Sequence, residues 1–479
     1  MKSRLHSNVV FSCTLILGSL LAIATPQSAD NRVNNLLTNN QTIDPLTSFT
    51  LPSLGCPMAH CDPRMSDRNL ITAPAGPVNL RWRDMNIGGA LTGLGCASNG
   101  STVVCALTDT APGGGAPYPG PYIIAFDGDG NRRWDSGNII NSNAWTSAPM
   151  LDNQGGAIVT DDTKIVRFDT KGNVLWNSPT PGGLPISPTI TNNGAIVLAT
   201  KASDGATQAP VSAYNPATGE LLGILNITDK GGFYETLNTP GGRNNRVYIS
   251  TQRRLLNGDV DPSNTGQLFA VEIDVTNPNP TQRLQVKWSF EYRSPSGASP
   301  LVINDVIYFD GAGLTPGTAP TTPYFFAVRD TGNAPVLVWA RPLNSKVPAS
   351  AAQDPRGGLW VIQLNYPYLL RLHETNGSIL QVLNIDQIVN EPGSYIPSSA
   401  MSITGTNSHP VMIVSAIASF IPDSPRILAI DLTSVLRPLR WKYPLDCFGQ
   451  YPVLKAADGS TVVVFATVRN GVAALSTVQ

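Results

Sequence analysis

The sequence predicts an all-β fold, an eight-bladed β-propeller built from four-stranded blades. One unit recurs along the chain at a spacing of about 40–50 residues, which is typical of propeller blades. Only 14% of the residues are charged, whereas Gly (43) and Pro (40) are abundant, so turns are many and long charged helices few. The last copy of the unit lacks one strand, and a segment near the N-terminus resembles that strand.

Each unit holds a Ser/Ala-Pro step, a β-branched run, an Asp or Asn turn with Gly, and then a Trp. Residues 148–176 and 187–220 are the clearest copies. The β-branched runs are apolar over four to six residues, as in strands that are buried on both faces. Asn, Asp and Gly tolerate the positive φ of tight hairpin turns. Each unit is therefore expected to form four short strands.

Seven full units follow Trp82, and residues 451–475 supply three strands of an eighth. Residues 78–82 resemble the missing fourth strand. Pairing of the first and last strands closes the ring and leaves no terminal sheet edge. Residues 77–479 are therefore predicted to form the propeller.

The repeat resembles that of a known superfamily. Residues Ala213 to Gly219 follow the first half of the pattern Ala-x-Asp-x-x-Thr-Gly-x-x-x-Trp, with Gly223 at the Trp position. Over residues 78–479 the chain resembles the PQQ-like propellers, which include quinoprotein alcohol dehydrogenases and a bacterial outer-membrane assembly scaffold. We expect it to be closer to the non-catalytic scaffold members.

A large ring in each unit is what packs one blade against the next, so we interpret the repeated tryptophans as packing residues. They are Trp82, Trp134, Trp176, Trp288, Trp339 and Trp441.

The resemblance also raises the question of a cofactor, because the dehydrogenases of this superfamily hold PQQ and Ca²⁺ on the axis of the ring. Those enzymes typically carry two adjacent cysteines at the cofactor, and this sequence has no Cys-Cys pair. No catalytic or calcium-binding residue can be transferred to it. We therefore expect no cofactor and favour a non-catalytic protein, with a PQQ- or metal-dependent oxidoreductase as an alternative.

A short segment before the first blade could bind a metal. Cys56, Met58, His60 and Cys61 offer the thiolate, thioether and imidazole groups that suit copper. The alternative, which we prefer, is a small loop closed by a Cys56–Cys61 disulfide in an oxidising compartment.

The other cysteines suggest a second disulfide. Cys96 and Cys105 flank a turn, so a hairpin would bring them opposite each other. Cys447 is then left over, and it could instead pair with Cys56 or Cys61.

The N-terminus predicts export. Lys2 and Arg4 precede the apolar run 9–23, which is typical of a signal peptide, here residues 1–29. No later apolar stretch reaches the roughly 18 residues of a membrane span. We expect a secreted protein, extracellular or periplasmic.

Residues 30–76 form an N-terminal arm that is rich in Asn and Pro and shows no periodicity. Such a segment is expected to be disordered or to lie along a surface in an extended form. Residues 46–51 alternate well enough to add to a sheet edge, either of this chain or of a neighbouring molecule. Self-assembly through the arm would make the protein a subunit of an extracellular filament or matrix.

Several functions are disfavoured. The chain has 32 basic and 33 acidic residues without a basic cluster, which argues against nucleic-acid binding. It has no Gly-x-Ser-x-Gly motif, and His373 and His409 lie in expected turns, which argues against hydrolysis. We predict a scaffold or binding module whose partner is a protein or an extracellular polymer. The candidate binding loops are the insertions 111–121, 257–265 and 313–323.

Overall fold

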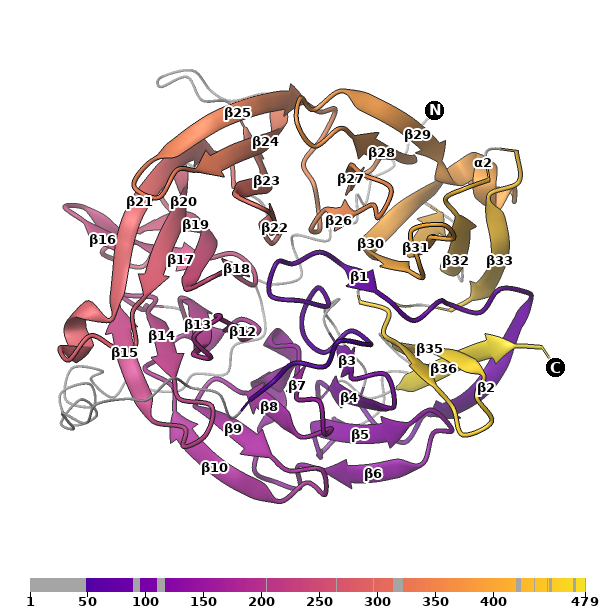
Figure 1. Ribbon diagram of the computed structural model, residues 1–479, viewed down its shortest axis with the longest axis horizontal. Helices are drawn as coiled ribbons and strands as arrows, with labels where there is room; N and C mark the ends of the chain where they lie inside the picture. The colour runs from indigo at the N-terminus through magenta and orange to yellow at the C-terminus, as the bar shows by residue number, and fades with distance from the viewer. Residues whose placement is uncertain are drawn as a thin grey trace, which may run out of the picture.

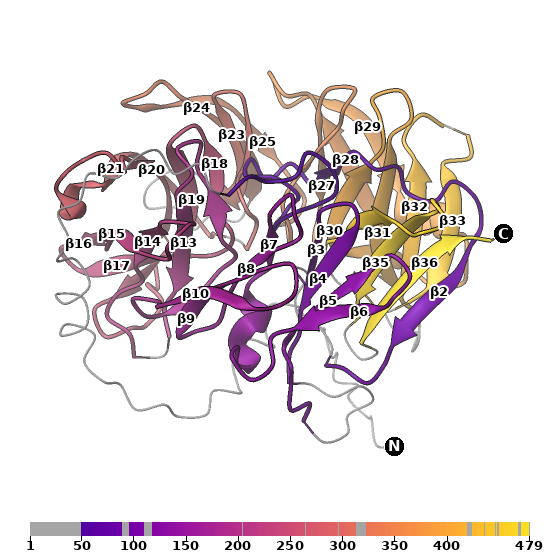
Figure 2. The ribbon, with the colours of Figure 1, turned by 60° about the horizontal axis from the view of Figure 1, so that its bottom comes forward.

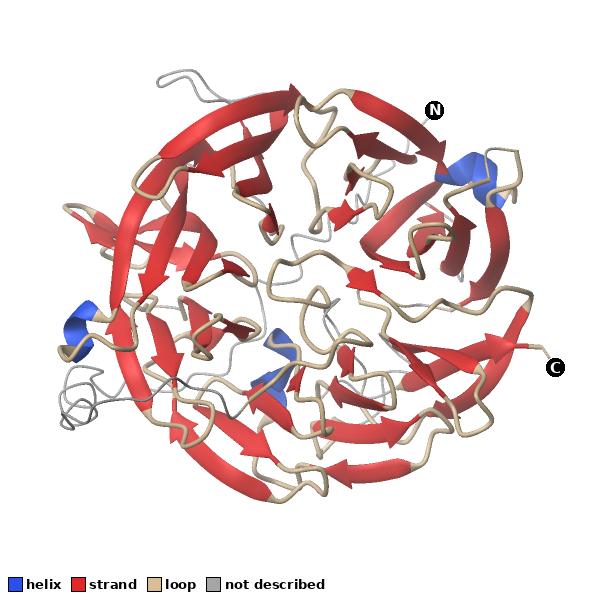
Figure 3. Ribbon diagram, in the orientation of Figure 1, coloured by secondary structure: helices blue, strands red, loops and turns tan. Residues whose placement is uncertain are grey.

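The computed structural model describes residues 49–478, except 89–94, 110–116, 204, 264, 296, 313–321, 419–423, 435, 446, 448–449 and 468–470. Strands dominate, and the helical segments are short (Figure 3). They are Ser142–Thr146, Pro280–Gln282 and α2 (Ile385–Val389). The predicted all-β class is confirmed. Within the described part of the chain, no helix is long and apolar enough to cross a membrane.

The strands form seven hydrogen-bonded sheets around a common centre (Figure 1). The first three sheets contain one repeat unit each. The first has β3 (Cys96–Ser98), β4 (Thr102–Ala106), β5 (Ile123–Asp127) and β6 (Arg132–Asp135). The second has β7 (Met150–Leu151), β8 (Ala157–Thr160), β9 (Lys164–Phe168) and β10 (Val174–Pro179). The third has β11 (Leu184–Pro185), β12 (Thr189–Ile190), β13 (Ile196–Lys201), β14 (Val211–Tyr214) and β15 (Leu221–Leu225).

The next sheet has ten strands and contains two units. The first unit comprises β18 (Gly241–Arg243), β19 (Arg246–Leu255), β20 (Thr265–Ile273) and β21 (Leu284–Arg293), extended by β16 (Thr228–Asp229) and β17 (Gly232–Thr236). The second unit comprises β22 (Leu301–Ile303), β23 (Val306–Ala312), β24 (Pro323–Asp330) and β25 (Pro335–Pro342). One residue pair, Arg293 and Ala312, joins the two units.

The remaining sheets complete the chain. One has β26 (Ala352–Gln353), β27 (Leu359–Ile362), β28 (Tyr368–Leu372) and β29 (Ile379–Asn384). Another has β1 (Arg68–Asn69), β30 (Tyr395–Thr404), β31 (Val411–Ala418), β32 (Arg426–Asp431) and β33 (Leu439–Pro444). The last has β34 (Val453–Lys455), β35 (Thr461–Ala466), β36 (Val472–Thr477) and β2 (Val78–Asp84).

That last sheet contains strands from both ends of the described chain. β2 pairs antiparallel with β36, with Trp82 opposite Ala474, and the two strands lie side by side in both views of the ribbon (Figures 1 and 2). The segment 78–82 therefore pairs with the C-terminal strands, as the sequence predicts.

A β-bulge recurs in the pairing of the third and fourth strands. In each of these pairs the fourth strand has one extra residue, which directly precedes the Trp or the residue that replaces it. The extra residues are Arg81, Arg133, Leu175, Leu222, Lys287, Val338, Leu380 and Arg440. A bulge bends and twists its strand locally. The same local geometry thus occurs eight times.

Most of the tryptophans are hydrogen-bonded to residues outside their own repeat unit. Trp176 donates a hydrogen bond from Nε1 to the carbonyl of Pro216 in the next sheet, at 2.9 Å, and Trp339 does the same to Glu374 at 2.8 Å. Trp82, Trp288 and Trp441 also donate to acceptors outside their own strands. Trp134 is buried as well, but its Nε1 has no acceptor among the described residues.

A glycine accompanies this packing. At Gly219, φ is +74° and a Cβ would lie 2.6 Å from the Trp176 ring; at Gly377, φ is +67° and a Cβ would lie 2.7 Å from Trp339. Glycine is required at these turns both for the backbone conformation and for the close approach of the indole.

Candidate functional site

The N-terminal arm lies across the centre of the ring of sheets (Figure 1). The arm (residues 30–76) was expected to be disordered or to follow a surface, but in its described part most of residues 55–69 are buried. Phe49 is packed in the core cluster that contains Trp176 and does not form an edge strand. Residues 46–48 of the predicted pairing segment lie outside the described residues.

Backbone hydrogen bonds explain why this segment is ordered. The inner strands of the sheets converge on the centre, so a few arm residues can reach many of them. The carbonyls of Pro63, Arg64, Ser66 and Asp67 accept, in order, from Gly242, Val302, Gln353 and Ile403, which belong to four successive repeat units. Cys56 pairs with Ser98, Pro57 accepts from Leu151, and Asn69 Nδ2 donates to the carbonyl of Val453. Among the described residues, the arm therefore forms hydrogen bonds with the inner strands of seven repeat units.

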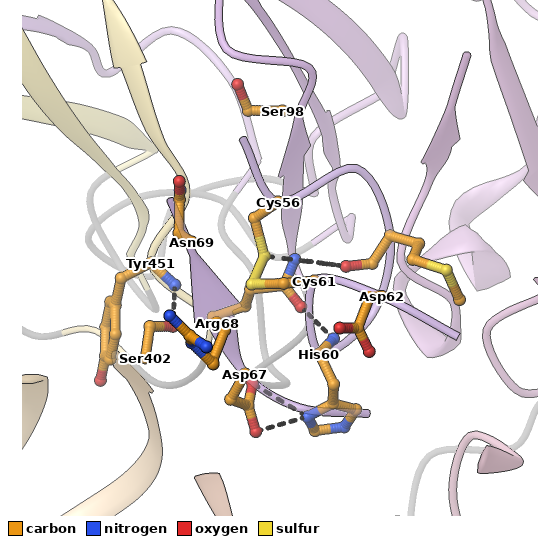
Figure 4. The surroundings of a disulfide bond; sticks show 12 residues. Cys56, His60, Cys61, Asp62, Asp67, Arg68, Asn69, Ser98, Ser402 and Tyr451 are labelled. Atoms are coloured by element: carbon orange, nitrogen blue, oxygen red, sulfur yellow. Dashed lines mark hydrogen bonds and ion pairs between the residues drawn. A yellow bond between two sulfur atoms is a disulfide. The ribbon is translucent and has the colours of Figure 1, made fainter. Parts of the chain in front are cut away.

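A disulfide closes a buried loop in the arm (Figure 4). Cys56 is bonded to Cys61, and the buried side chain of Gln450 holds the loop. The backbone N–H of His60 donates to Gln450 Oε1 at 2.7 Å, and Gln450 Nε2 donates to the carbonyl of Met58 at 2.8 Å. The same Nε2 lies 3.2 Å from the carbonyl oxygen of Cys96, whose own disulfide partner is Cys105.

The structure thus places the candidate metal ligands as follows. Cys56 and Cys61 form a disulfide with each other, Met58 is a core residue, and the His60 side chain is hydrogen-bonded to Asp67. Among the described residues, no group of three or more His, Cys, Asp or Glu side chains could hold a metal ion. Cys447 is buried and belongs to neither disulfide.

His60 is the centre of a buried polar chain that the sequence analysis missed. Its Nδ1 lies 3.0 and 3.1 Å from the two carboxylate oxygens of Asp67, and its Nε2 lies 3.3 Å from Ser350 Oγ. Ser350 Oγ also accepts from the backbone N–H of Ser299 at 2.9 Å. The exposed fractions of Asp67, His60 and Ser350 are 0%, 2% and 0%.

Burial governs the protonation of this chain. The loss of water raises the pKa of Asp67 above its usual value, while the charge and hydrogen bond of His60 oppose that shift. An Nδ1–H that donates to Asp67 leaves Nε2 to accept from the Ser350 hydroxyl. The order Asp-His-Ser is that of hydrolytic triads. A nucleophile must be accessible to its substrate, however, and Ser350 is fully buried. We therefore interpret this chain of groups as a structural link between the arm and the sheets.

The three candidate binding loops share a position in the fold. Each joins the second and third strands of its unit: β4 to β5, β19 to β20, and β23 to β24. Because strands alternate in direction, the strand ends that these loops join lie at the opposite end from the first turn of each unit. The arm contacts those first turns, since Asn153 donates to Thr50 and Gly405 donates to Asn69. Residues 111–116, 264 and 313–321 of these loops lie outside the described residues.

The described part of one loop is a hairpin that ion pairs stabilise. Arg253 binds Asp229 at 2.7 Å and also pairs with Asp261. The guanidinium group lowers the pKa of Asp229 well below its usual value. At the tip, Leu256 and Val260 are 58% and 44% exposed. Ion pairs therefore stabilise a hairpin whose tip exposes apolar side chains.

The fold matches that of solved propellers. The quinohemoprotein alcohol dehydrogenase from Comamonas testosteroni is 12% identical, with a TM-score of 0.58 over 93% of this chain and 84% of that chain. The quinohemoprotein alcohol dehydrogenase ADHIIG from Pseudomonas putida HK5 is 11% identical, with a TM-score of 0.54 over 88% and 79%. BamB from Moraxella catarrhalis is 10% identical over 84% of this chain and 98% of that chain, with a TM-score of 0.42.

The chain therefore has the fold of the PQQ-like β-propellers, and the resemblance inferred from the repeat motif is confirmed at the level of the fold. No protein-family model matches the sequence. No curated protein matches it either.

Proposed function

We propose that this chain is a secreted, non-catalytic, eight-bladed propeller that binds a partner through the loops between its second and third strands. The eight bulged strand pairs support the count of blades, because each unit repeats the same local geometry. The pairing of β2 with β36 supports closure by the two ends of the chain. The proposed domains are a signal peptide (1–29), an arm (30–76) and the propeller (77–479).

The observation that carries the non-catalytic role is the position of the arm. In the related dehydrogenases, PQQ and Ca²⁺ lie on the axis of the ring. Here the axis is lined by the chain's own residues 56–69, which are hydrogen-bonded to the inner strands of seven units. The His60–Asp67 pair and Gln450 fix that segment from within. These residues do not fit a quinone on the axis, because the cofactor would have to displace a buried and disulfide-closed segment.

A reconstitution experiment tests this part of the proposal. The purified protein is incubated with PQQ and Ca²⁺, and bound quinone is followed by absorbance and calorimetry, together with a dye-linked assay over a panel of alcohols. We expect no saturable binding and no turnover. Stoichiometric PQQ binding with turnover would overturn the non-catalytic role.

We expect the partner at the ends of the strands that the loops 111–121, 257–265 and 313–323 join, opposite the first turns that the arm contacts. Proteins use loops on a rigid scaffold for recognition, and exposed apolar side chains at such positions favour contact with a partner. Leu256 and Val260 at the tip of one hairpin meet this description. The partner is a protein or an extracellular polymer.

Site-specific crosslinking tests the position of this surface. A photoreactive residue at Leu256 should capture a partner from the native secretion. Leu436, which is 94% exposed in a turn between the third and fourth strands, is the matched control at the opposite rim. A defined partner captured from Leu256 but not from Leu436 is the expected result. Equal capture from both positions, or capture from Leu436 alone, would refute the assignment of the rim.

The disulfides support the proposal that the protein is exported. The two disulfides are compatible with an oxidising compartment. We propose that the two pairs persist in the mature protein, and a non-reducing peptide map would establish this. A map that shows Cys447 bonded to Cys56 or Cys61 would contradict it.

A further inference from the structure

A groove lies between two neighbouring repeat units, at the end of β25 and against β28 and β29. Its volume is about 260 Å³, and it is open to solvent. Arg341 of β25 and Gln363 line it, together with Tyr368 of β28 and Ile379 and Val382 of β29. The residues of this groove are not among those that bond the arm, and one of them, Leu343, donates a backbone hydrogen bond to Pro323 at the end of a candidate binding loop.

One wall carries a guanidinium group that has no acceptor. Arg341 Nε is buried and makes no hydrogen bond, and Arg341 forms no ion pair among the described residues. By contrast, Arg246 and Arg253 each pair with two carboxylates. Charged donors in folded proteins usually have an acceptor. Arg341 Nε itself is enclosed, so an anion in the groove would reach the guanidinium group through its Nη atoms, which also make no hydrogen bond among the described residues.

A second donor lies in the same groove. Gln363 is only 1% exposed, and its Oε1 accepts from the backbone N–H of Asn344 at 2.8 Å. That bond fixes the orientation of the carboxamide, because only its oxygen can accept. Gln363 Nε2 is left as a donor without an acceptor among the described residues. Two donors of different kinds, one of them charged, therefore border a single small space.

The remaining walls are apolar and accessible. Tyr368, Ile379 and Val382 are 38%, 41% and 49% exposed. A ligand that suits the groove must bring an acceptor for the two donors and an apolar surface for these side chains.

We propose that the groove binds a small monocarboxylate with an apolar body of about the size of hexanoate. A carboxylate offers two oxygens and one negative charge, which match the guanidinium of Arg341 and the Nε2 of Gln363. A single cationic side chain and apolar walls favour a monoanion over a phosphate dianion. The apolar body then covers Tyr368, Ile379 and Val382. The inference stands apart from the proposed rim function, because it requires neither a partner nor an empty axis.

The probe is hexanoate, measured against the full chain by calorimetry and by the ¹⁵N resonance of the Arg341 Nε–Hε group. We expect saturable binding with a dissociation constant on the order of 1 mM, as befits a ligand with few atoms. Binding should shift the Arg341 resonance. Hexan-1-ol has the same body without the charge, and it should bind at least about tenfold more weakly, since hydrogen bonds to charged groups are the stronger ones.

Two variants separate the site from net charge. Arg341→Gln should weaken hexanoate binding by about tenfold to a hundredfold. Arg329→Gln removes the same charge from an exposed ion pair on β24 of the same unit, and it should leave binding unchanged. Thermal unfolding of each variant shows that it is folded, and the resonance shift of the wild-type chain remains as a readout that needs no variant.

Three outcomes would overturn the proposal. They are no saturable binding of hexanoate by the wild-type chain, binding that does not move the Arg341 resonance, and equal weakening in the two arginine variants. A peptide that ends in leucine provides a further comparison. Binding of its free-acid form without binding of hexanoate would show that the groove holds the end of a polypeptide instead.

Discussion

Gly219→Ala is the sharpest test of how neighbouring sheets pack. The new methyl group would lie 2.6 Å from the Trp176 ring, and the backbone has a φ of +74°. A non-glycine residue in the left-handed region costs about 1–2 kcal/mol. Forcing a methyl group into a packed site adds a cost of about 1–3 kcal/mol. We therefore expect the free energy of unfolding to fall by about 2–5 kcal/mol.

Gly459→Ala is the matched control. Gly459 has a φ of +79° in an exposed turn, and a Cβ there would have no neighbour within 4 Å. This variant should lose only about 1–2 kcal/mol, the backbone cost alone. Urea unfolding followed by tryptophan fluorescence and circular dichroism measures both variants. Equal losses would mean that Trp176 does not pack closely on Gly219, and the account of the repeat would fail with it.

Three further predictions concern the arm and the tryptophans. Because burial raises the pKa of Asp67 above its unfolded value, its contribution to stability is fully present below the usual Asp range and is lost as pH rises through the raised pKa. Asp67→Asn should remove this part of the pH dependence, as measured by urea titrations at several pH values. No difference between the variant and the wild-type protein would mean that the carboxylate is solvated. Replacing both Cys56 and Cys61 by Ser opens a short loop and should lower the free energy of unfolding by about 2 kcal/mol in the same assay. Amide hydrogen exchange in residues 56–69 should become faster, and unchanged exchange would count against the disulfide's role. Trp176→Phe should destabilise the protein by about 1 kcal/mol more than Trp134→Phe, because of these two residues Trp176 alone donates an indole hydrogen bond to a described residue. Equal losses would contradict this prediction.

The repeat could be predicted from the sequence because its determinants are local. The Asp or Asn turn, its glycine and the following Trp lie within about ten residues, and the hairpin they form is decided mainly by those residues. The position of the Trp is set by strand pairing and not by spacing. Trp134 lies 7 residues after Asp127 and Trp339 lies 9 after Asp330, yet both directly follow the bulged residue of their strand. A fixed motif therefore matches only some copies.

The arm could not be predicted in the same way. Its composition is that of a disordered segment, and its order comes from carbonyls that meet inner strands distant in sequence. No side-chain pattern records such contacts. Part of the polar chain did leave a signal, because His60 and Asp67 are close in sequence and lie beside two cysteines. Ser350 and Gln450 are about 290 and 390 residues away from His60, and only the ring brings them to the centre.

These distances bear on how the ring is completed. β2 needs β36, and the disulfide loop needs Gln450, so the N-terminal segment reaches its contacts only when the last unit is available. Contacts of such separation are slow to form, since the chain between them must first be ordered. The repeat units pair locally and can form earlier. The N-terminal region then makes two kinds of contact. β2 supplies the outer strand of the last sheet, and residues 56–69 bind the inner strands. Both the last sheet and the centre of the molecule therefore depend on contacts of one short N-terminal region.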